Sequence, residues 1–305
     1  MGKYILQRLA FTVVVIFCIS IMVFVITHVV GNPVDIMLPL TATEQQRIEL
    51  TQRLGLDQPL HVQLITYLKD LARLNFGVSW WQRVACEEVI MKFIIPTAFL
   101  VTLSCLFALI IGVPLGIISA YRPGSLLDRT ITILSLSGVC LPPFWIGLML
   151  MLVFAVNLGW FYTSGFGAWK HLILPMITLA CNPAGHVAQI VRFEMLQQLN
   201  SLYAITARAK GVSEVTLLFK HCLKNIMVPT VTMLGVDYVA LMAGGSATVE
   251  VVFGWPGFGN LITGTIENLD FPLLQAEVFF VAVFVCIINL LIDFMYTAFD
   301  PRIRF

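Results

Sequence analysis

Charged residues are scarce in this sequence. They make up 11% of the 305 residues, whereas hydrophobic residues make up 59%. A water-soluble protein of this length needs far more polar surface than such a composition supplies. The composition therefore excludes a soluble globular protein and indicates a chain whose main solvent is lipid.

Motifs for catalysis, phosphate binding and metal binding are also missing from the sequence. The only Gly-Lys pair is Gly2-Lys3, so no GxxxxGK[ST] phosphate-binding loop is present. HExxH, GxSxG and paired catalytic carboxylates do not occur either. The seven cysteines show no CxxC spacing, which argues against a disulfide framework or a zinc site. No basic patch typical of nucleic-acid binding appears. We expect no catalytic residue, no metal site and no cofactor bound by this chain.

Long apolar runs dominate the sequence instead. A helix needs about 20 predominantly apolar residues to cross the hydrocarbon core, and open sheet edges cannot satisfy their backbone groups in lipid. The runs predict an all-α, polytopic membrane protein with six transmembrane helices, organised as a single domain over residues 1–305. The expected spans are residues 9–30, 97–121, 130–158, 172–191, 225–249 and 278–299.

The distribution of Lys and Arg predicts the orientation of these spans. Basic residues gather at the N-terminus, after the second span, between spans four and five, and in the C-terminal tail. The positive-inside rule places these segments, and hence both termini, in the cytoplasm. The polar segment 31–96 is then an extracytoplasmic loop, and its pattern predicts short helices over residues 43–53 and 58–74.

The cytoplasmic segment 201–224 has the pattern helix, glycine, helix. Gly211 is a natural helix end because glycine adopts positive φ without a Cβ clash, and Ser213 is a suitable N-cap for the next helix. Four apolar residues would share one face of that second helix: Val215, Leu218, Phe219 and Cys222. By itself the pattern allows a docking element or an amphipathic pair lying on the anionic inner leaflet.

Several motifs together resemble one family. Ala204-Ile-Thr-Ala-Arg-Ala-Lys-Gly211, followed by His221-Cys-Leu-Lys-Asn225 and Pro229, resembles the ATPase-coupling loop of ABC import permeases. The Glu-Ala-Ala that usually begins this loop is replaced by Ile205-Thr-Ala207. Three further motifs are typical of the dipeptide, oligopeptide and nickel branch: Phe253-Gly-Trp-Pro-Gly-Phe-Gly259, Asp270-Phe-Pro272 and Asp300-Pro-Arg-Ile303. The chain is thus similar, over residues 4–304, to inner-membrane permeases of binding-protein-dependent importers.

This resemblance implies a function and a set of partners. The chain would be a multi-pass permease subunit in the bacterial inner membrane, and it would translocate a solute delivered by an extracytoplasmic binding protein. A second, similar but non-identical permease would complete the pore, and two partner ATPase subunits would bind ATP and magnesium. The solute would be a di- or oligopeptide, or nickel or a metal chelate, to which the loop 165–171 looks nearest. A self-contained secondary transporter or channel is the alternative.

The resemblance also implies which residues contact the ATPase. They are Tyr203, Ala204, Thr206, Ala207, Arg208, Ala209, Lys210, Gly211, His221, Lys224, Asn225 and Pro229.

Polar residues in the spans suggest where the pore and its gate lie. Ionisable groups are costly in lipid and usually face a protein interior or a water-filled cavity, which makes Asp237 the better pore candidate. Asn289 and Asp293 share a helix face and are expected to form interhelical hydrogen bonds. We interpret His186 as a helix-packing residue and not as a metal ligand.

The turn that follows span five has two interpretations. Glu250 is expected to be solvated at the mouth of that span, and Trp255 is expected to lie at the membrane–water interface. Together with Pro256 and Gly257 these residues form either an outer gate or a tight loop without a gating role.

Overall fold

The computed structural model describes residues 2–30, 34, 38, 43–53 and 55–299, with the side chains of residues 2–9, 28–30, 53 and 293–299 left out. Within these ranges the chain forms helices and turns, and its only extended pairing is an isolated bridge between Val78 and Ala85. This confirms the prediction of an all-α protein.

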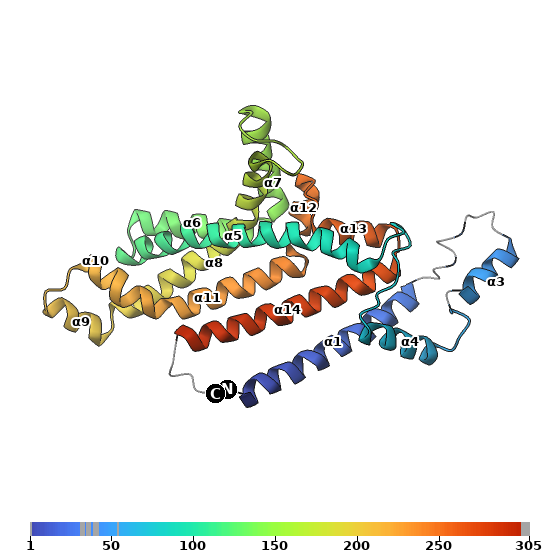
Figure 1. Cartoon of the computed structure of the whole chain (residues 1–305). Coiled ribbons are helices and arrows are strands. Elements are labelled where there is room, and N and C mark those ends of the chain that lie inside the picture. Colours follow the sequence, from blue (N-terminus) through green and yellow to red (C-terminus); the bar gives the residue numbers. More distant parts are fainter. Residues whose placement is uncertain (1, 31–33, 35–37, 39–42, 54, 300–305) are drawn as a thin grey trace. The chain divides into compact units, whose positions relative to one another are not determined.

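The first half of the chain contains two long helices, α1 (Gly2–Val30) and α5 (Cys86–Tyr121), and several shorter ones among the described residues (Figure 1). The shorter elements are α3 (Glu44–Arg53), α4 (Leu60–Ala72), α6 (Leu126–Cys140), α7 (Pro143–Leu150) and the π-helical η1 (Met151–Asn157). The helices α3 and α4 correspond to the two short helices predicted in the loop 31–96.

The second half begins with the 31-residue α8 (Trp169–Leu199). The elements after it are α9 (Leu202–Ala209), α10 (Glu214–Thr216), the π-helical η2 (Leu217–Cys222), α11 (Leu223–Ala240), the π-helical η3 (Leu241–Gly245), α12 (Ala247–Phe253), α13 (Phe258–Glu267) and α14 (Phe271–Phe299).

Four helical stretches are long and apolar enough to cross a membrane, among the residues that the structure describes. They are residues 10–27, 86–121, 214–245 and 271–292, and α6 with α7 and η1 adds a fifth if this bent pair is one span. The predicted span 172–191 lies inside α8, whose polar residues include Asn182, His186 and Gln189. Multi-pass insertion is therefore supported, whereas the count of six spans and the side of the termini stay predictions.

The predicted span 130–158 is not one straight helix. It is divided at Leu141 and Pro142, and its two halves meet at an angle of 109°. Consecutive prolines at 142 and 143 explain the break, because proline lacks an N–H donor and disfavours helical geometry at the residue before it. Leu141 and Pro142 accordingly have extended ψ angles of 137° and 132°.

The chain divides into two compact units. The first contains residues 1–95 and 261–286, and the second contains residues 96–260 and 287–305. In the first unit Phe24 of α1 stacks on Tyr67 of α4, and the Gln275 amide of α14 donates a hydrogen bond of 2.8 Å to Thr27. Polar and aromatic side-chain contacts therefore join α1, α4 and α14 in this unit.

Small residues bring the helices of the second unit close together. A Cβ added at Gly112 or Gly116 of α5 would lie 2.7–2.9 Å from atoms of α8, including backbone oxygens. Gly185 of α8 approaches the backbone of α6 in the same way at Ser135. Such close approach is typical of packed transmembrane helices. It brings α8 against both α5 and α6, alongside α11 (Figure 1).

Candidate functional site

The segment 201–224 has the predicted helix–glycine–helix arrangement. The helix α9 ends at Ala209, and Gly211 follows with φ of 77°, a backbone conformation that suits glycine. Ser213 caps the next turn by accepting a hydrogen bond of 3.3 Å from the Thr216 amide. The turn is therefore encoded by local sequence alone.

This segment exposes several large apolar side chains. Leu202 is 84% exposed, Val215 67% and Phe219 58%. Beneath them Ala204 and Cys222 are fully buried. Isolated exposed apolar residues are ordinary, but several on one short segment are suited to contact with a partner protein or with the membrane surface. We name Leu202, Ile205, Val215 and Phe219 the docking surface.

The expected common face of the second helix is wrong. Leu218 and Cys222 are buried, whereas Val215 and Phe219 are exposed. The cause is the π-helical geometry of η2, since its wider turn pairs residue i with i+5 and shifts side chains away from 3.6-residue spacing.

Hydrogen bonds fix the segment to the helices beside it. Arg208 pairs with Glu214 across the glycine turn at 2.7 Å and also donates to the Leu199 carbonyl at 3.0 Å. The hydrogen bond to Glu214 raises the pKa of the Arg208 guanidinium, which therefore stays charged. The Tyr203 hydroxyl donates to Gln198 at 2.7 Å and accepts from Asn225 at 3.3 Å. The segment is thus a projection that these hydrogen bonds hold in place on α8 and α11.

The other residues predicted to contact the ATPase are distributed over this projection. Ala207 and Pro229 are half-buried. The exposed ones are Thr206, Ala209, Lys210, Gly211, His221 and Lys224.

The expectation for Glu250 is corrected by the structure. Its side chain is fully buried and not solvated at a span mouth. It accepts hydrogen bonds from Thr97 at 2.7 Å and from Ser246 at 3.0 Å, as well as from the backbone amides of Gly259 at 2.7 Å and Asn260 at 3.2 Å. The amides belong to the first turn of α13, where unpaired N–H groups favour an acidic partner. Glu250 therefore joins α5, α12 and the start of α13.

The residues around Glu250 form a closed turn. Gly254 ends α12 in a left-handed conformation with φ of 58°. Trp255 is 2% exposed, and its indole N–H donates to the Pro96 carbonyl at 3.2 Å, so it is an interior residue and not an interfacial anchor. Pro256 is half-buried, and Gly257 lies against the Glu250 carboxyl group. All four predicted gate residues lie in this one turn.

Asp237 lies in α11 beside His186 of α8. The His186 Nδ1 atom is 2.9 Å and 3.1 Å from the two carboxylate oxygens. His186 thus packs between helices, as expected, but through a polar contact with the pore candidate. Among the described residues no cluster of three His, Cys, Asp or Glu residues could hold a metal ion.

The predicted pairing of Asn289 and Asp293 stays a prediction. Asn289 is exposed on α14, and the side chain of Asp293 lies outside the described residues.

Three buried acidic residues were not recognised from the sequence. Asp128 at the start of α6 accepts a two-fold hydrogen bond from Arg192 of α8, at 2.6 Å and 2.9 Å. In the first unit Asp270 accepts from Ser79 and from the Trp81 amide. The third, Glu277, accepts a hydrogen bond of 2.7 Å from Thr265 in that unit. Their only signal was a charge beside an apolar run, and these partners lie 12 to 191 residues away in sequence.

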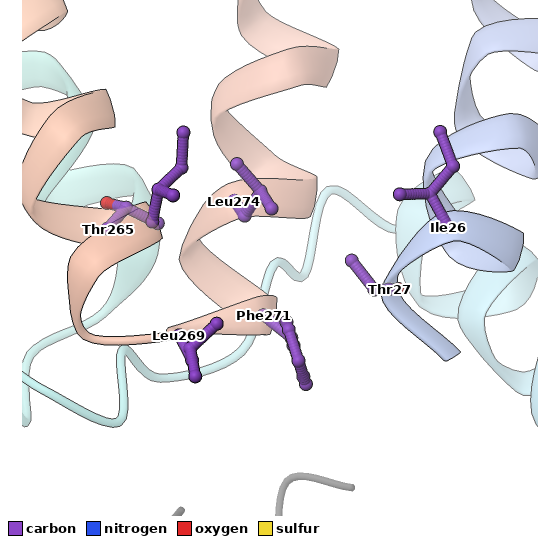
Figure 2. A pocket seen from close by; sticks show the side chains of 7 residues that line it. Ile26, Thr27, Thr265, Leu269, Phe271 and Leu274 are labelled. Atoms are coloured by element: carbon purple, nitrogen blue, oxygen red, sulfur yellow. The ribbon is translucent and has the colours of Figure 1, made fainter. Parts of the chain in front are cut away.

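The first unit also contains an apolar hollow (Figure 2). Its lining consists of Ile26, Thr27, Thr265, Ile266, Leu269, Phe271 and Leu274. The two threonine hydroxyls already donate, to the Phe24 carbonyl and to Glu277. The lining is therefore suited to apolar groups and not to a polar solute.

Comparison with known proteins agrees with this arrangement. Residues 112–305 match the family described as binding-protein-dependent transport system inner membrane component, and residues 1–99 match the N-terminal region of such components. The chain is 37% identical over 306 residues to the glutathione transport system permease protein GsiC of Salmonella choleraesuis (strain SC-B67), covering all of both chains. It is 38% identical over 307 residues to GsiC of Escherichia coli (strain K12), again covering all of both.

A solved structure has the same fold. The chain superimposes on an inward-facing conformation of the MetNI methionine ABC transporter with a TM-score of 0.60 and 18% identity, over 70% of this chain and 97% of that one. Matches to family models over both halves, together with relatives at 37% identity or more along the entire length, show the family. The chain belongs to the binding-protein-dependent transport system inner membrane components, and it is a permease subunit of an ABC importer.

Proposed function

We propose that this permease subunit imports a short peptide of the size and chemistry of glutathione. The observation that carries the proposal is the similarity to glutathione transport permeases over the whole of both chains. Similarity that includes every span and loop supports a related solute path as well as a related fold. A di- or oligopeptide is the wider class to which such a solute belongs.

Import of nickel or a metal chelate is the second candidate. The loop 165–171, which ends in His171, favours it by sequence, because this loop looks nearest to nickel or metal-chelate permeases. In the structure, however, the Nδ1 atom of His171 accepts a hydrogen bond of 3.2 Å from the Ala168 amide at the start of α8, and its ring stacks on Tyr162. A histidine engaged in capping a helix is less suited to hand over a metal ion, and this supports the peptide.

The docking surface is where we place the contact with an ATPase subunit. ATP-driven import requires a contact whose geometry differs between two states and is stiff enough to transmit the change. The projection formed by α9 and η2 meets the second need, because Arg208, Tyr203 and buried Ala204 fix it to the helices behind it. Its exposed apolar residues offer an area that an ATPase subunit can contact.

The closed turn around Glu250 is the element that we assign to the outer gate. It joins α5, α12 and α13 through a single buried carboxylate, so any motion of one helix must be transmitted to the others or must break hydrogen bonds. We expect a second, non-identical permease subunit to complete the pore, because the spans of one chain are too few to enclose a solute path. Family membership implies an ATPase and a solute-binding protein as further partners.

Two variants of equal exposure test the proposed docking contact. Leu202→Asp places a charge on the docking surface at a residue that is 84% exposed, and Leu126→Asp does the same at one that is 80% exposed at the start of α6. In mild detergent the tagged chain should co-purify an ATPase and a second permease. Leu202→Asp should lose the ATPase, and Leu126→Asp should retain it. Equal retention by both variants would place the ATPase contact elsewhere.

Uptake by membrane vesicles that contain the complex and its binding protein tests the solute. Labelled glutathione should accumulate with ATP, and an unlabelled dipeptide should compete better than a nickel–histidine chelate. Competition by the chelate alone would favour the second candidate.

A further inference from the structure

The His186–Asp237 contact has a defined hydrogen-bond direction. An ionised carboxylate accepts only, so when Asp237 is ionised the imidazole N–H that points to it is on Nδ1, which lies 2.9 Å and 3.1 Å from the two oxygens. The other ring nitrogen, Nε2, makes no hydrogen bond to any residue that the structure describes. A carboxylate on Nδ1 fixes the ring orientation and makes Nε2 a better acceptor.

Polar groups continue from this pair onto a neighbouring helix. Tyr238 follows Asp237 in α11, and its hydroxyl lies 3.1 Å from the hydroxyl of Thr102 on α5. Thr102 is exposed on α5. Three packed helices therefore contribute to one polar belt, which we define as Thr102, His186, Asp237 and Tyr238.

The position of this belt limits what it can face. Thr102 and Asp237 lie within the stretches 86–121 and 214–245 that are long and apolar enough to cross a membrane, and the side chain of His186 beside them is 26% exposed. A half-exposed imidazole with an open nitrogen, an adjacent carboxylate and an exposed hydroxyl would all be costly against lipid tails. Such groups face protein or a water-filled cavity, and in a transporter they mark the solute pathway by default.

We propose that the polar belt lines the solute path and that Nε2 of His186 accepts hydrogen bonds from N–H groups of the passing solute. Amide and ammonium groups of a peptide are donors of this kind, so the solute class in this inference rests on the proposed function. The placement on the path does not rest on it. A single acceptor on a fixed ring suits a contact that must form and then break as the solute moves on.

Thiol chemistry tests the placement without any solute. In a variant of the whole complex whose native cysteines are replaced, Thr102→Cys substitutes a side chain of similar size at an exposed position of the belt. The matched control is Val101→Cys, which is the neighbouring residue and fully buried. The probes are two methanethiosulfonates, one bearing a trimethylammonium group and one bearing a sulfonate. The belt holds a carboxylate, so the cationic probe should react on the order of tenfold faster than the anionic one.

Replacing the charge completes the test. Asp237→Asn in the Thr102→Cys background should remove most of the preference for the cationic probe while leaving the thiol reactive. His186→Gln is the second variant, used if Asp237→Asn does not assemble, and it should preserve the preference because the carboxylate remains. A Thr102→Cys thiol as unreactive as Val101→Cys would overturn the placement on the path, as would equal rates for both probes. The experiment is independent of the imported solute, so failure of the peptide proposal and failure of this inference are separate results.

Discussion

The docking surface and the closed turn around Glu250 both combine apolar side chains with nearby charged ones, but the first exposes them and the second buries them. The docking surface leaves Leu202, Val215 and Phe219 exposed, and the ion pair between Arg208 and Glu214 beside it also lies at the exterior. The closed turn buries Glu250 and Trp255 and satisfies each carboxylate oxygen of Glu250 from within the unit. The first region offers its apolar residues to the partner that we propose, whereas the second satisfies its polar groups by itself.

This difference predicts how each region responds to substitution. A buried polar group that loses its partners costs free energy of folding, whereas an exposed residue contributes little to folding. Changes in the closed turn should therefore lower stability first and transport as a consequence. Changes on the docking surface should leave the fold intact and lower only the coupling to ATP hydrolysis.

Loss of the Glu250 carboxylate should have the largest effect. Glu250→Ala leaves the Gly259 and Asn260 amides and the Thr97 hydroxyl without their acceptor in a buried site, which should cost on the order of 3 kcal/mol of unfolding free energy. Thermal unfolding of the purified complex in detergent measures this as a lower Tm. Glu250→Gln keeps one acceptor oxygen, so its loss should be smaller. Equal Tm values for Glu250→Ala and the parent chain would show that the turn is not held in this way.

Two glycines, one in each region, provide the next comparison. A Cβ at Gly257 would lie 2.4 Å from the Glu250 carboxyl group, so Gly257→Ala must displace a buried side chain at a cost of about 2 kcal/mol. Gly211 has open space around it and φ of 77°, so Gly211→Ala meets only backbone strain of about 1 kcal/mol. We expect a lower Tm for Gly257→Ala, and for Gly211→Ala a nearly normal Tm with less binding-protein-stimulated ATPase activity. The reverse pattern would contradict the division between the two regions.

Local sequence predicted the docking region well and the closed turn poorly. The end of α9, the positive φ of Gly211 and the Ser213 cap depend on residues within a few positions of one another. The faces of η2 were wrong because a π-helical turn is set by packing and leaves no pattern in the apolar residues. Two consecutive prolines did signal the bend after Cys140, but not its angle of 109°.

Distant contacts explain what was missed in the closed turn and along α8. Glu250 was expected to be solvated because nothing near it in sequence could pair with it, and the Thr97 hydroxyl lies 153 residues away. His186 and Asp237 are 51 residues apart, and Asp128 and Arg192 are 64 apart. The apolar runs identify which helices lie in the membrane, but they do not determine which faces of those helices meet.

The exposed ion pair of the docking region should show the smallest effect. Arg208→Ala removes the contact with Glu214 and the hydrogen bond to the Leu199 carbonyl, whereas Glu214→Gln removes only the charge of the partner. Exposed ion pairs contribute little to folding and are screened by salt, so neither variant should shift the Tm measurably.

If the ion pair holds the projection in place against the ATPase, binding-protein-stimulated hydrolysis should fall modestly in Arg208→Ala and less in Glu214→Gln. Raising the salt concentration should lower the activity of the parent complex toward that of Glu214→Gln, and should change the Glu214→Gln complex less. A clear drop in Tm for Glu214→Gln would mean that the ion pair supports the fold. The segment 201–224 would then contribute to folding as well as to docking.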